Sequence, residues 1–175
     1  MWLVDKSRGY LKIMLEIKII KHENIRYSQL EDICKIKSIF GNYTLESQLN
    51  WIENNVKAND IHFLIYDNNK LIAYTNLIEE TLLINNEKIS ILGIGNVCVN
   101  EKGKSKGSLL MKNVNKFLSN NDKIGLLFCK KNLISFYEKT DWILIEPNYS
   151  EEICWMIFNY DLAKKEAISY DGRLF

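Results

Sequence analysis

The stretch GNVCVNEKGKSKGSLLM, residues 95–111, decides the fold. It begins as an apolar strand, passes through a loop rich in lysine and glycine, and enters a helical pattern with Leu110, Val114 and Leu118 along one side. Helix N-termini attract phosphate groups, because their first backbone N–H groups are free and the helix dipole favours negative charge. The stretch therefore predicts a strand, a loop and a helix, with an anion site at the start of the helix.

Two amphipathic helices are expected before this stretch, after a first strand that follows Met14. The first helix spans residues 28–40, with Ser28 as its expected N-cap and apolar residues at spacings of three and four. The second helix begins at Thr44. Ser47 lies three residues after it, a spacing typical of a capped helix start.

Three strands joined by tight turns come next. The strands are expected in residues 61–67, 71–84 and 87–100, and Asn-Asn pairs lie in the turns at 68–69 and 85–86. Both turns favour antiparallel hairpins, because asparagine tolerates positive φ.

The C-terminal part alternates strands with one short helix. We expect strands at residues 124–129, 142–147 and 153–162 and a helix at residues 132–139. The tail ISYDGRLF follows at residues 168–175. A chain of 175 residues fits one domain, which we place at residues 14–175, with residues 1–13 as an extension. The expected fold class is α+β, a sheet flanked by helices.

Composition and charge exclude several classes of protein. The 47% share of hydrophobic residues is enough for a substantial core. The 23 basic and 22 acidic side chains leave a net charge of +1, which argues against a nucleic-acid partner. The longest uncharged stretch, residues 89–100, is well short of the roughly 20 apolar residues that span a bilayer, so no membrane partner is expected.

Cysteine and histidine spacing argues against a metal site. The four cysteines form no CxxC pair, and His22 and His62 are far from each other and from the cysteines in sequence. Cysteines in apolar runs usually pack as small hydrophobic residues. We therefore expect buried thiols, a reducing cytoplasmic location and no metal.

Residues 95–111 resemble the acyl-CoA-binding motif of the GNAT superfamily of N-acetyltransferases, whose core is [QR]xxGx[GA] between a strand and a helix. In the preferred register Lys102 takes the basic position, Ser105 the first glycine and Gly107 the last. In a second register Lys104 takes the basic position. That register places Leu109 where the motif needs a small residue.

A second segment, KNLISFYEKTDWILI at residues 131–145, resembles the family's sequence after the fifth strand. The motif is matched by Asn132, Phe136, Tyr137 and Glu138. Asp141 stands where the motif usually has glycine, and aspartate can take that place because it also adopts the left-handed conformation. The resemblance implies that Tyr137 donates a proton to the coenzyme sulfur. The other interpretation of Tyr137 is a core aromatic residue with its hydroxyl satisfied.

The resemblance implies a mixed, mainly antiparallel sheet, acetyl-CoA as co-substrate, and backbone contacts to the coenzyme from a fourth strand that splays away from the fifth. The Cys98 thiol is expected to be packed and not to carry an acyl group. The implied coenzyme contacts are Val97, Cys98, Val99, Lys102, Gly103, Lys104, Ser105, Lys106, Gly107, Ser108, Asn132 and Tyr137.

The general base is harder to assign. The family often places a carboxylate on the fourth strand, where this chain has Gly93, Gly95 and Asn96. Glu79 and Glu80, on the neighbouring strand, are the candidates for a base acting through water and for acceptor binding. The alternative for this pair is solvated charge at a strand edge.

The tail resembles, over a short match, the C-terminal end of aminoglycoside 2'-N-acetyltransferases. That resemblance implies that Asp171 and the terminal carboxylate of Phe175 meet a cationic substrate; a frayed end is the alternative. The expected function is acetyl transfer from acetyl-CoA to a primary amine of a small molecule, including an amino sugar or aminoglycoside. An inactive GNAT-fold CoA-binding module and acetylation of a protein or peptide amine stay open, as does a homodimer.

Overall fold

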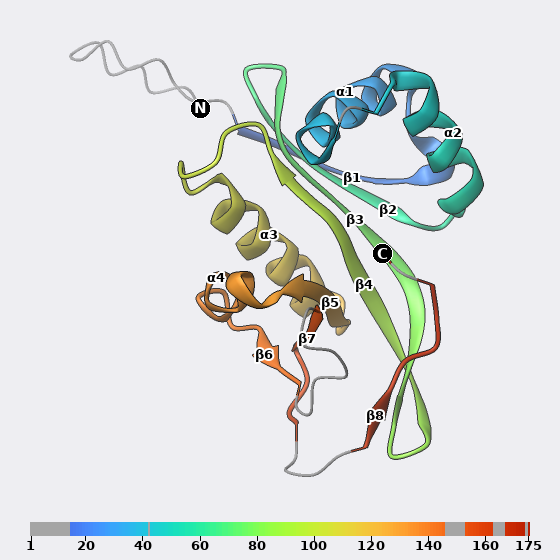
Figure 1. Ribbon diagram of the computed structural model, residues 1–175, viewed down its shortest axis with the longest axis vertical. Helices are drawn as coiled ribbons and strands as arrows, with labels where there is room; N and C mark the ends of the chain where they lie inside the picture. The colour runs from blue at the N-terminus through green and yellow to red at the C-terminus, as the bar shows by residue number, and fades with distance from the viewer. Residues whose placement is uncertain (1–14, 42, 146–152, 163–166, 174) are drawn as a thin grey trace, which may run out of the picture.

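The computed structural model describes residues 15–41, 43–145, 153–162, 167–173 and 175, and shows a mixed, mainly antiparallel sheet flanked by helices (Figure 1). The expected fold class is confirmed. The expected extension, residues 1–13, lies outside the described residues. In chain order the elements are β1 Leu15–Lys21, α1 Tyr27–Lys37, α2 Leu45–Asn55, β2 Ile61–Asp67, β3 Lys70–Ile84, β4 Glu87–Val99, α3 Lys106–Asn120, β5 Ile124–Lys130, α4 Ile134–Glu138, β6 Ile143–Leu144, β7 Ile153–Phe158 and β8 Ile168–Ser169.

The strands follow the order β1-β2-β3-β4-β5-β7-β6, and β8 pairs with the end of β3. Neighbours along the order pair antiparallel except β4 and β5, which are parallel. Positive φ at the asparagine pairs 68–69 and 85–86 closes the two expected hairpin turns. No helix of the described residues is long and apolar enough to cross a membrane.

The two N-terminal helices begin in different ways. Thr44 caps α2 as its sequence indicates, since its hydroxyl oxygen accepts a hydrogen bond from the Ser47 backbone N–H at 3.1 Å. The expected N-cap of α1 is wrong, because Ser28 lies inside the helix and Arg26 is the N-cap. The Gln29 side chain accepts a hydrogen bond from the Arg26 backbone N–H at 3.0 Å and fixes that start.

Helices cover both faces of the sheet (Figure 1). Successive residues of a strand point to opposite faces, so Phe63 packs with α3 residues such as Leu110, while Leu64 packs with α1 residues such as Ile33. At the other end of the sheet, Ile168 of β8 joins a third apolar cluster. The sheet therefore has a core on each side.

The C-terminal segment is fixed to the sheet, so the frayed-end interpretation of the tail is wrong. Beyond β8, the Arg173 guanidinium donates to both carboxylate oxygens of the buried Asp60, at 2.7 and 2.9 Å, and to Glu80 at 2.6 Å. Paired, bidentate geometry of this kind orders both partners. The segment leads from this ion pair to Phe175.

The two histidines, distant in sequence, meet in the structure. His22 Nδ1 and His62 Nε2 are 2.9 Å apart, and His62 Nδ1 lies 2.9 Å from the Tyr74 hydroxyl. His62 is fully buried, and burial together with His22 lowers its pKa to about 4. His22, His62 and the Tyr74 hydroxyl form a chain of polar groups. No cluster of three or more His, Cys, Asp or Glu side chains is found among the described residues.

This chain of groups predicts acid sensitivity. The folded-state pKa of His62, about 4, lies below its ordinary 6.5, so its stabilising contribution is complete above pH 6.5 and falls as the pH drops toward 4. From pH 8 to pH 5 the loss is about 2 kcal/mol of unfolding free energy. Urea unfolding of wild type and His62→Gln at both pH values measures it. Equal pH dependence in the two proteins would contradict the assignment.

Candidate active site

A bulge bends β4 in its C-terminal half. Gly95 pairs with Asn76 and Cys98 with Tyr74, so β4 has one residue more than β3 between these pairs, and Asn96 adopts a φ of +52°. The Thr75 hydroxyl donates to the Gly95 carbonyl at 2.6 Å and holds the bend. The bulge re-aims β4 where the strand would otherwise continue beside β5.

β4 and β5 pair along only part of their length. Their parallel register runs from Ile91 with Ile124 to Ile94 with Leu127 and ends just before the bulge. Beyond that point β4 and β5 no longer pair, so the edge of β4 that faces β5 has no strand partner among the described residues. The splay expected from the resemblance is present.

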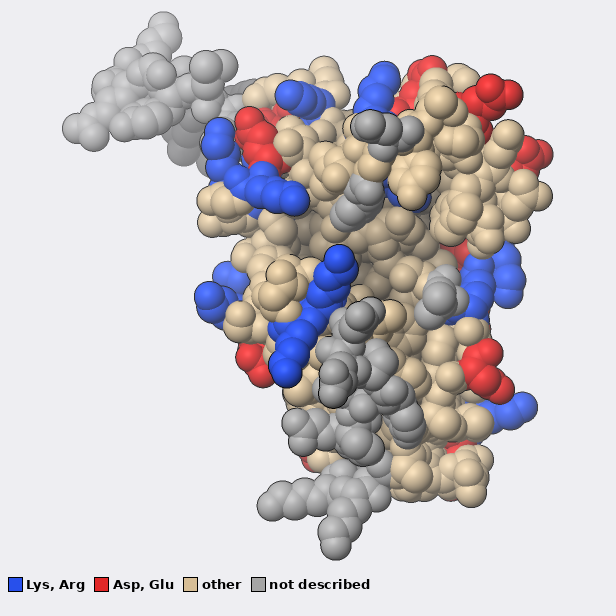
Figure 2. Space-filling model, viewed as in Figure 1, with Lys and Arg blue, Asp and Glu red and all other residues tan. Residues whose placement is uncertain are grey.

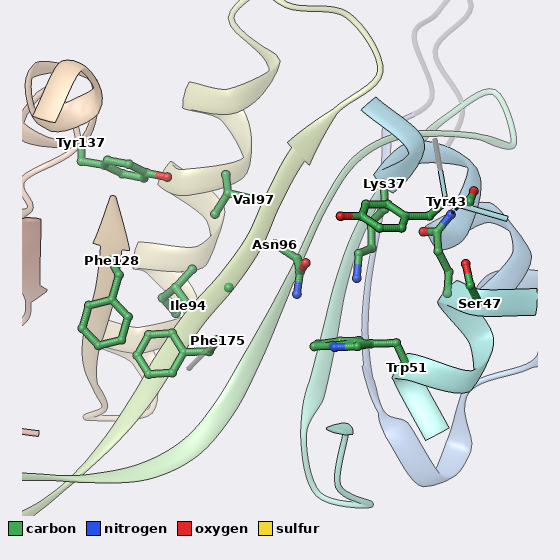
Figure 3. Close-up of a pocket in the computed structure, with 12 residues that line it drawn as sticks. Lys37, Tyr43, Ser47, Trp51, Ile94, Asn96, Val97, Phe128, Tyr137 and Phe175 are labelled. Carbon is green, nitrogen blue, oxygen red and sulfur yellow. Dashed lines mark hydrogen bonds between the residues drawn. The ribbon is translucent and has the colours of Figure 1, made fainter. Parts of the chain in front are cut away.

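A cavity of about 690 Å³ opens at this split. One wall comes from α1, α2 and the segment between them, the floor from β4, and the other wall from β5, α4 and the C-terminal residue (Figure 3). Figure 2 shows the same face hollowed near its centre. The lining residues are Lys37, Tyr43, Ser47, Gln48, Trp51, Ile94, Gly95, Asn96, Val97, Phe128, Tyr137 and Phe175.

Tyr137 presents a hydroxyl to the cavity. The side chain is 6% exposed, its hydroxyl points toward Val97 in Figure 3, and within the described residues the hydroxyl has no hydrogen-bond partner. Burial raises the pKa of Tyr137 far above its ordinary value, so the hydroxyl keeps its proton at any assay pH. An unpaired buried donor is a group held ready for a ligand atom.

A polar network fixes the turn after Tyr137. The Asn115 side chain of α3 donates to the Thr140 carbonyl at 2.5 Å and accepts from the Trp142 indole at 2.9 Å. Asp141 has a φ of +64°, the left-handed conformation expected for a residue that replaces glycine. The network ties α4 to α3, so the tyrosine is positioned by buried contacts.

The loop before α3 presents free backbone N–H groups. Ser105 is the N-cap residue, with a φ of +56° and no side-chain capping bond, so the first-turn N–H groups of residues 106–108 have no partner in the part of the chain that the structure describes. The left-handed Ser105 agrees with the register that gives it a glycine position. Lys106 and Lys104 flank the loop, but both also contact Glu101, at 2.6 and 3.5 Å.

The Ser105 conformation leads to a prediction about stability. A left-handed φ costs an ordinary residue roughly 1–2 kcal/mol and a β-branched residue more, whereas glycine adopts it freely. We expect Ser105→Gly to be at least as stable as wild type and Ser105→Val to lose about 1–2 kcal/mol of unfolding free energy. Denaturant unfolding of the three proteins tests this. A valine variant as stable as the glycine variant would show that the loop is not held in this conformation.

Comparison with known proteins gives the fold. No family model and no curated protein sequence matches the chain. Escherichia coli ElaA superposes with a TM-score of 0.61 at 20% identity, covering 83% of this chain and 99% of ElaA. An acyl-CoA N-acyltransferase from Pseudomonas aeruginosa has a TM-score of 0.63 at 15% identity, with 83% and 99% covered.

A third similar structure is the Bacillus subtilis N-acetyltransferase YlbP in complex with coenzyme A. Its TM-score is 0.55 at 15% identity, with 83% of this chain and 96% of YlbP covered. The chain has the GNAT fold. At these identities the likeness extends to the fold, and residue roles depend on this chain's own geometry.

The GNAT fold brings some of the expected coenzyme residues to the cavity. Val97 and Tyr137 line it, and Gly107 lies in the first turn of α3. Cys98 does not line the cavity and is buried in the cluster that packs against α1; burial raises its pKa to about 12, so the thiol is protonated and packed. Asn132 is exposed and is not part of the lining.

The expected acceptor residues lie elsewhere or are engaged. Glu79 is exposed and Glu80 is held by Arg173, and neither lines the cavity. Asp171 is exposed and also lies outside the lining, whereas Phe175 does line it. The structure therefore brings one member of this set, Phe175, to the site.

Phe175 occupies space that two glycines leave open. A Cβ atom at Gly93 would lie 2.5 Å from its ring, and one at Gly95 would lie 2.3 Å from its carbonyl carbon. The ring stacks on Phe128 with centroids 4.7 Å apart. At the strand position where the resemblance suggested a carboxylate, this chain has Gly93 and Gly95, and Phe175 packs against both.

The opposite wall was missed at the sequence level. Lys37, Tyr43, Ser47 and Trp51 come from α1, α2 and the segment that joins them. Tyr43 and Trp51 are large aromatic side chains that remain exposed, at 64% and 45%, which the sequence does not indicate. Nothing in their spacing indicates that they face β4.

Proposed function

We propose that the chain is an acetyl-CoA-dependent N-acyltransferase that transfers the acetyl group directly to a primary amine of a small molecule. The observation that carries the proposal is the buried Tyr137 hydroxyl, which lies without a described partner at the split between β4 and β5. Free N–H groups at the start of α3 and the unpaired edge of β4 support it, because they suit a pyrophosphate and an amide-containing arm.

Acetyl-CoA supplies a reactive thioester when it is bound. In the transfer the N–C bond to the acetyl carbon forms and the C–S bond breaks; the amine nitrogen loses a proton to water, the leaving sulfur takes one up, and the donor of that proton regains it from water. Tyr137 donates the proton to the sulfur. The first turn of α3, with Gly107, binds phosphate, and the β4 edge at residues 97–99 orients the pantetheine arm that carries the acetyl group.

On the acceptor side, the Asn96 side chain has an oxygen available. Its Nδ2 donates to Asn76 Oδ1 at 2.9 Å, which leaves Asn96 Oδ1 to accept from an incoming amine. No Asp or Glu side chain is among the described residues that line the cavity. A polycationic aminoglycoside is expected to pair with several acidic groups, so this lining favours a small amine with fewer positive charges.

Binding and turnover test the proposal in that order. Native mass spectrometry with acetyl-CoA should show one coenzyme per chain, and release of free CoA thiol should follow when small amines are added. Coenzyme binding without thiol release across amino acids, amino sugars, polyamines and peptides would favour the inactive binding module. Release with peptides alone would favour a protein or peptide acceptor, and absence of coenzyme binding would contradict the proposal.

A further inference from the structure

The wall of the cavity formed by α1, α2 and the segment between them, called the acceptor wall below, has one charged side chain among its described residues, Lys37 at the end of α1. Its nitrogen points into the space between Asn96 and Trp51 (Figure 3). In the part of the chain that the structure describes, no carboxylate lies within 4.0 Å of it, although other lysines, such as Lys35 on the same helix, have such partners. Within the described residues, Lys37 therefore has no ion-pair partner.

The surroundings of Lys37 are mostly apolar. Its ammonium lies 4.7 Å from the centroid of the Trp51 ring, and its other neighbours include the thiols of Cys34 and Cys98. Both thiols have raised pKa values and are neutral, so they supply no negative charge. Burial lowers the pKa of Lys37, which shows the cost of keeping the charge there.

Keeping an ammonium group in these surroundings costs free energy unless an anionic ligand pairs with it. The Trp51 ring and the nearby C-terminus of α1 supply partial negative potential but no full charge. Buried charges in proteins are normally paired, and a small-molecule site is normally apolar with a few charged groups that fix orientation. Lys37 in an aromatic cavity has the properties of such an orienting group.

We propose that the acceptor is a primary amine that also carries an anionic group, a carboxylate or a phosphate, on an apolar body, and that Lys37 binds the anionic group. The inference rests on the proposed function and names its substrate class. Trp51 and Tyr43 contact the apolar body, and Asn96 Oδ1 accepts from the amine at the β4 bulge. The anion at Lys37 thus holds the amine toward the split where Tyr137 lies.

Ligand binding tests the anion site without any turnover. Phenylacetate and phenylacetamide have the same ring and differ in charge, and phenyl phosphate replaces the carboxylate with a phosphate. Calorimetric titration of the full chain should show one or both anions binding about 10-fold or more tightly than the amide. The comparison of the two anions identifies the preferred group. Equal affinity of the amide and both anions would overturn the inference, whether or not acetyl-CoA binds.

Substitution at Lys37 gives the second arm. Lys37→Met should abolish the preference for the anion, and Lys37→Arg should keep most of it. The matched control is Lys35→Met, two residues earlier on α1, where an exposed lysine contacts Asp32 at 3.8 Å and does not line the cavity. An anion preference that survives in Lys37→Met would place the anion site elsewhere and contradict the assignment.

Turnover distinguishes this inference from the proposed function. Phenylalanine and phenethylamine differ by a carboxylate, and phosphoethanolamine and ethanolamine differ by a phosphate. In the thiol-release assay the anionic member of at least one pair should have the lower KM, and Lys37→Met should raise that KM about 10-fold with kcat little changed. Equal turnover of neutral and anionic amines would overturn the inference and leave the acyltransferase standing. No thiol release with bound acetyl-CoA would overturn the proposed function, while the anion titration still decides the site.

Discussion

Replacing Tyr137 by phenylalanine is expected to lower kcat by about 10²- to 10⁴-fold, the usual contribution of a general acid. The affinity for acetyl-CoA should stay nearly unchanged, because the lost hydroxyl acts on the leaving sulfur and hardly on the bound ground state. Packing should also persist, since the ring contacts with Phe136 and Trp142 remain. Thiol release measures kcat, and calorimetry measures coenzyme affinity.

The control for this substitution is Tyr66→Phe, a buried tyrosine on β2 that does not line the cavity. It should keep wild-type kcat. The raised pKa of Tyr137 adds a second criterion, because wild type should show no loss of rate from ionisation of this residue between pH 6 and pH 9. A Tyr137→Phe protein with wild-type turnover would make the residue structural.

Gly107→Val is expected to weaken acetyl-CoA binding by roughly 100-fold, equivalent to about 2.7 kcal/mol. The side chain would block the close approach of phosphate oxygens to the N–H groups of the first turn of α3. A Cβ atom there would also lie 3.1 Å from the Phe136 ring, so the thermal unfolding of the variant must be measured as well.

Two further variants separate binding from folding. Lys116→Val introduces the same side chain at an exposed position of α3 and should leave coenzyme affinity unchanged. Gly107→Ala adds only the Cβ atom and should lose a smaller part of the affinity. Wild-type coenzyme affinity in a folded Gly107→Val protein would show that the phosphates bind elsewhere.

Local sequence patterns predicted most of the fold. The asparagine pairs specify the turns of the meander, and Thr44 specifies the start of α2, because each effect acts within a few residues. The start of α1 was misplaced, since the capping group there is the side chain of Gln29, which a search for serine or threonine overlooks. The strand β8 was missed because two residues carry no periodicity.

The residues of the candidate site were predicted only where they belong to a recognisable sequence motif. Tyr137 and the loop before α3 follow from local resemblance, and the conformation of Ser105 agrees with the register chosen for it. The acceptor wall depends on contacts between distant segments. Arg173 reaches Asp60 and Glu80 across the chain, and Lys37 meets the floor of β4 only in the folded state. Sequence spacing gives no signal for such contacts.

A crystal structure of the protein with coenzyme A tests the central claim most directly. The account predicts the pyrophosphate on the backbone N–H groups of residues 106–108, the pantetheine arm along β4 at the split from β5, and the sulfur within hydrogen-bonding distance of the Tyr137 hydroxyl. Coenzyme bound outside this split, or a sulfur that Tyr137 does not reach, would contradict it.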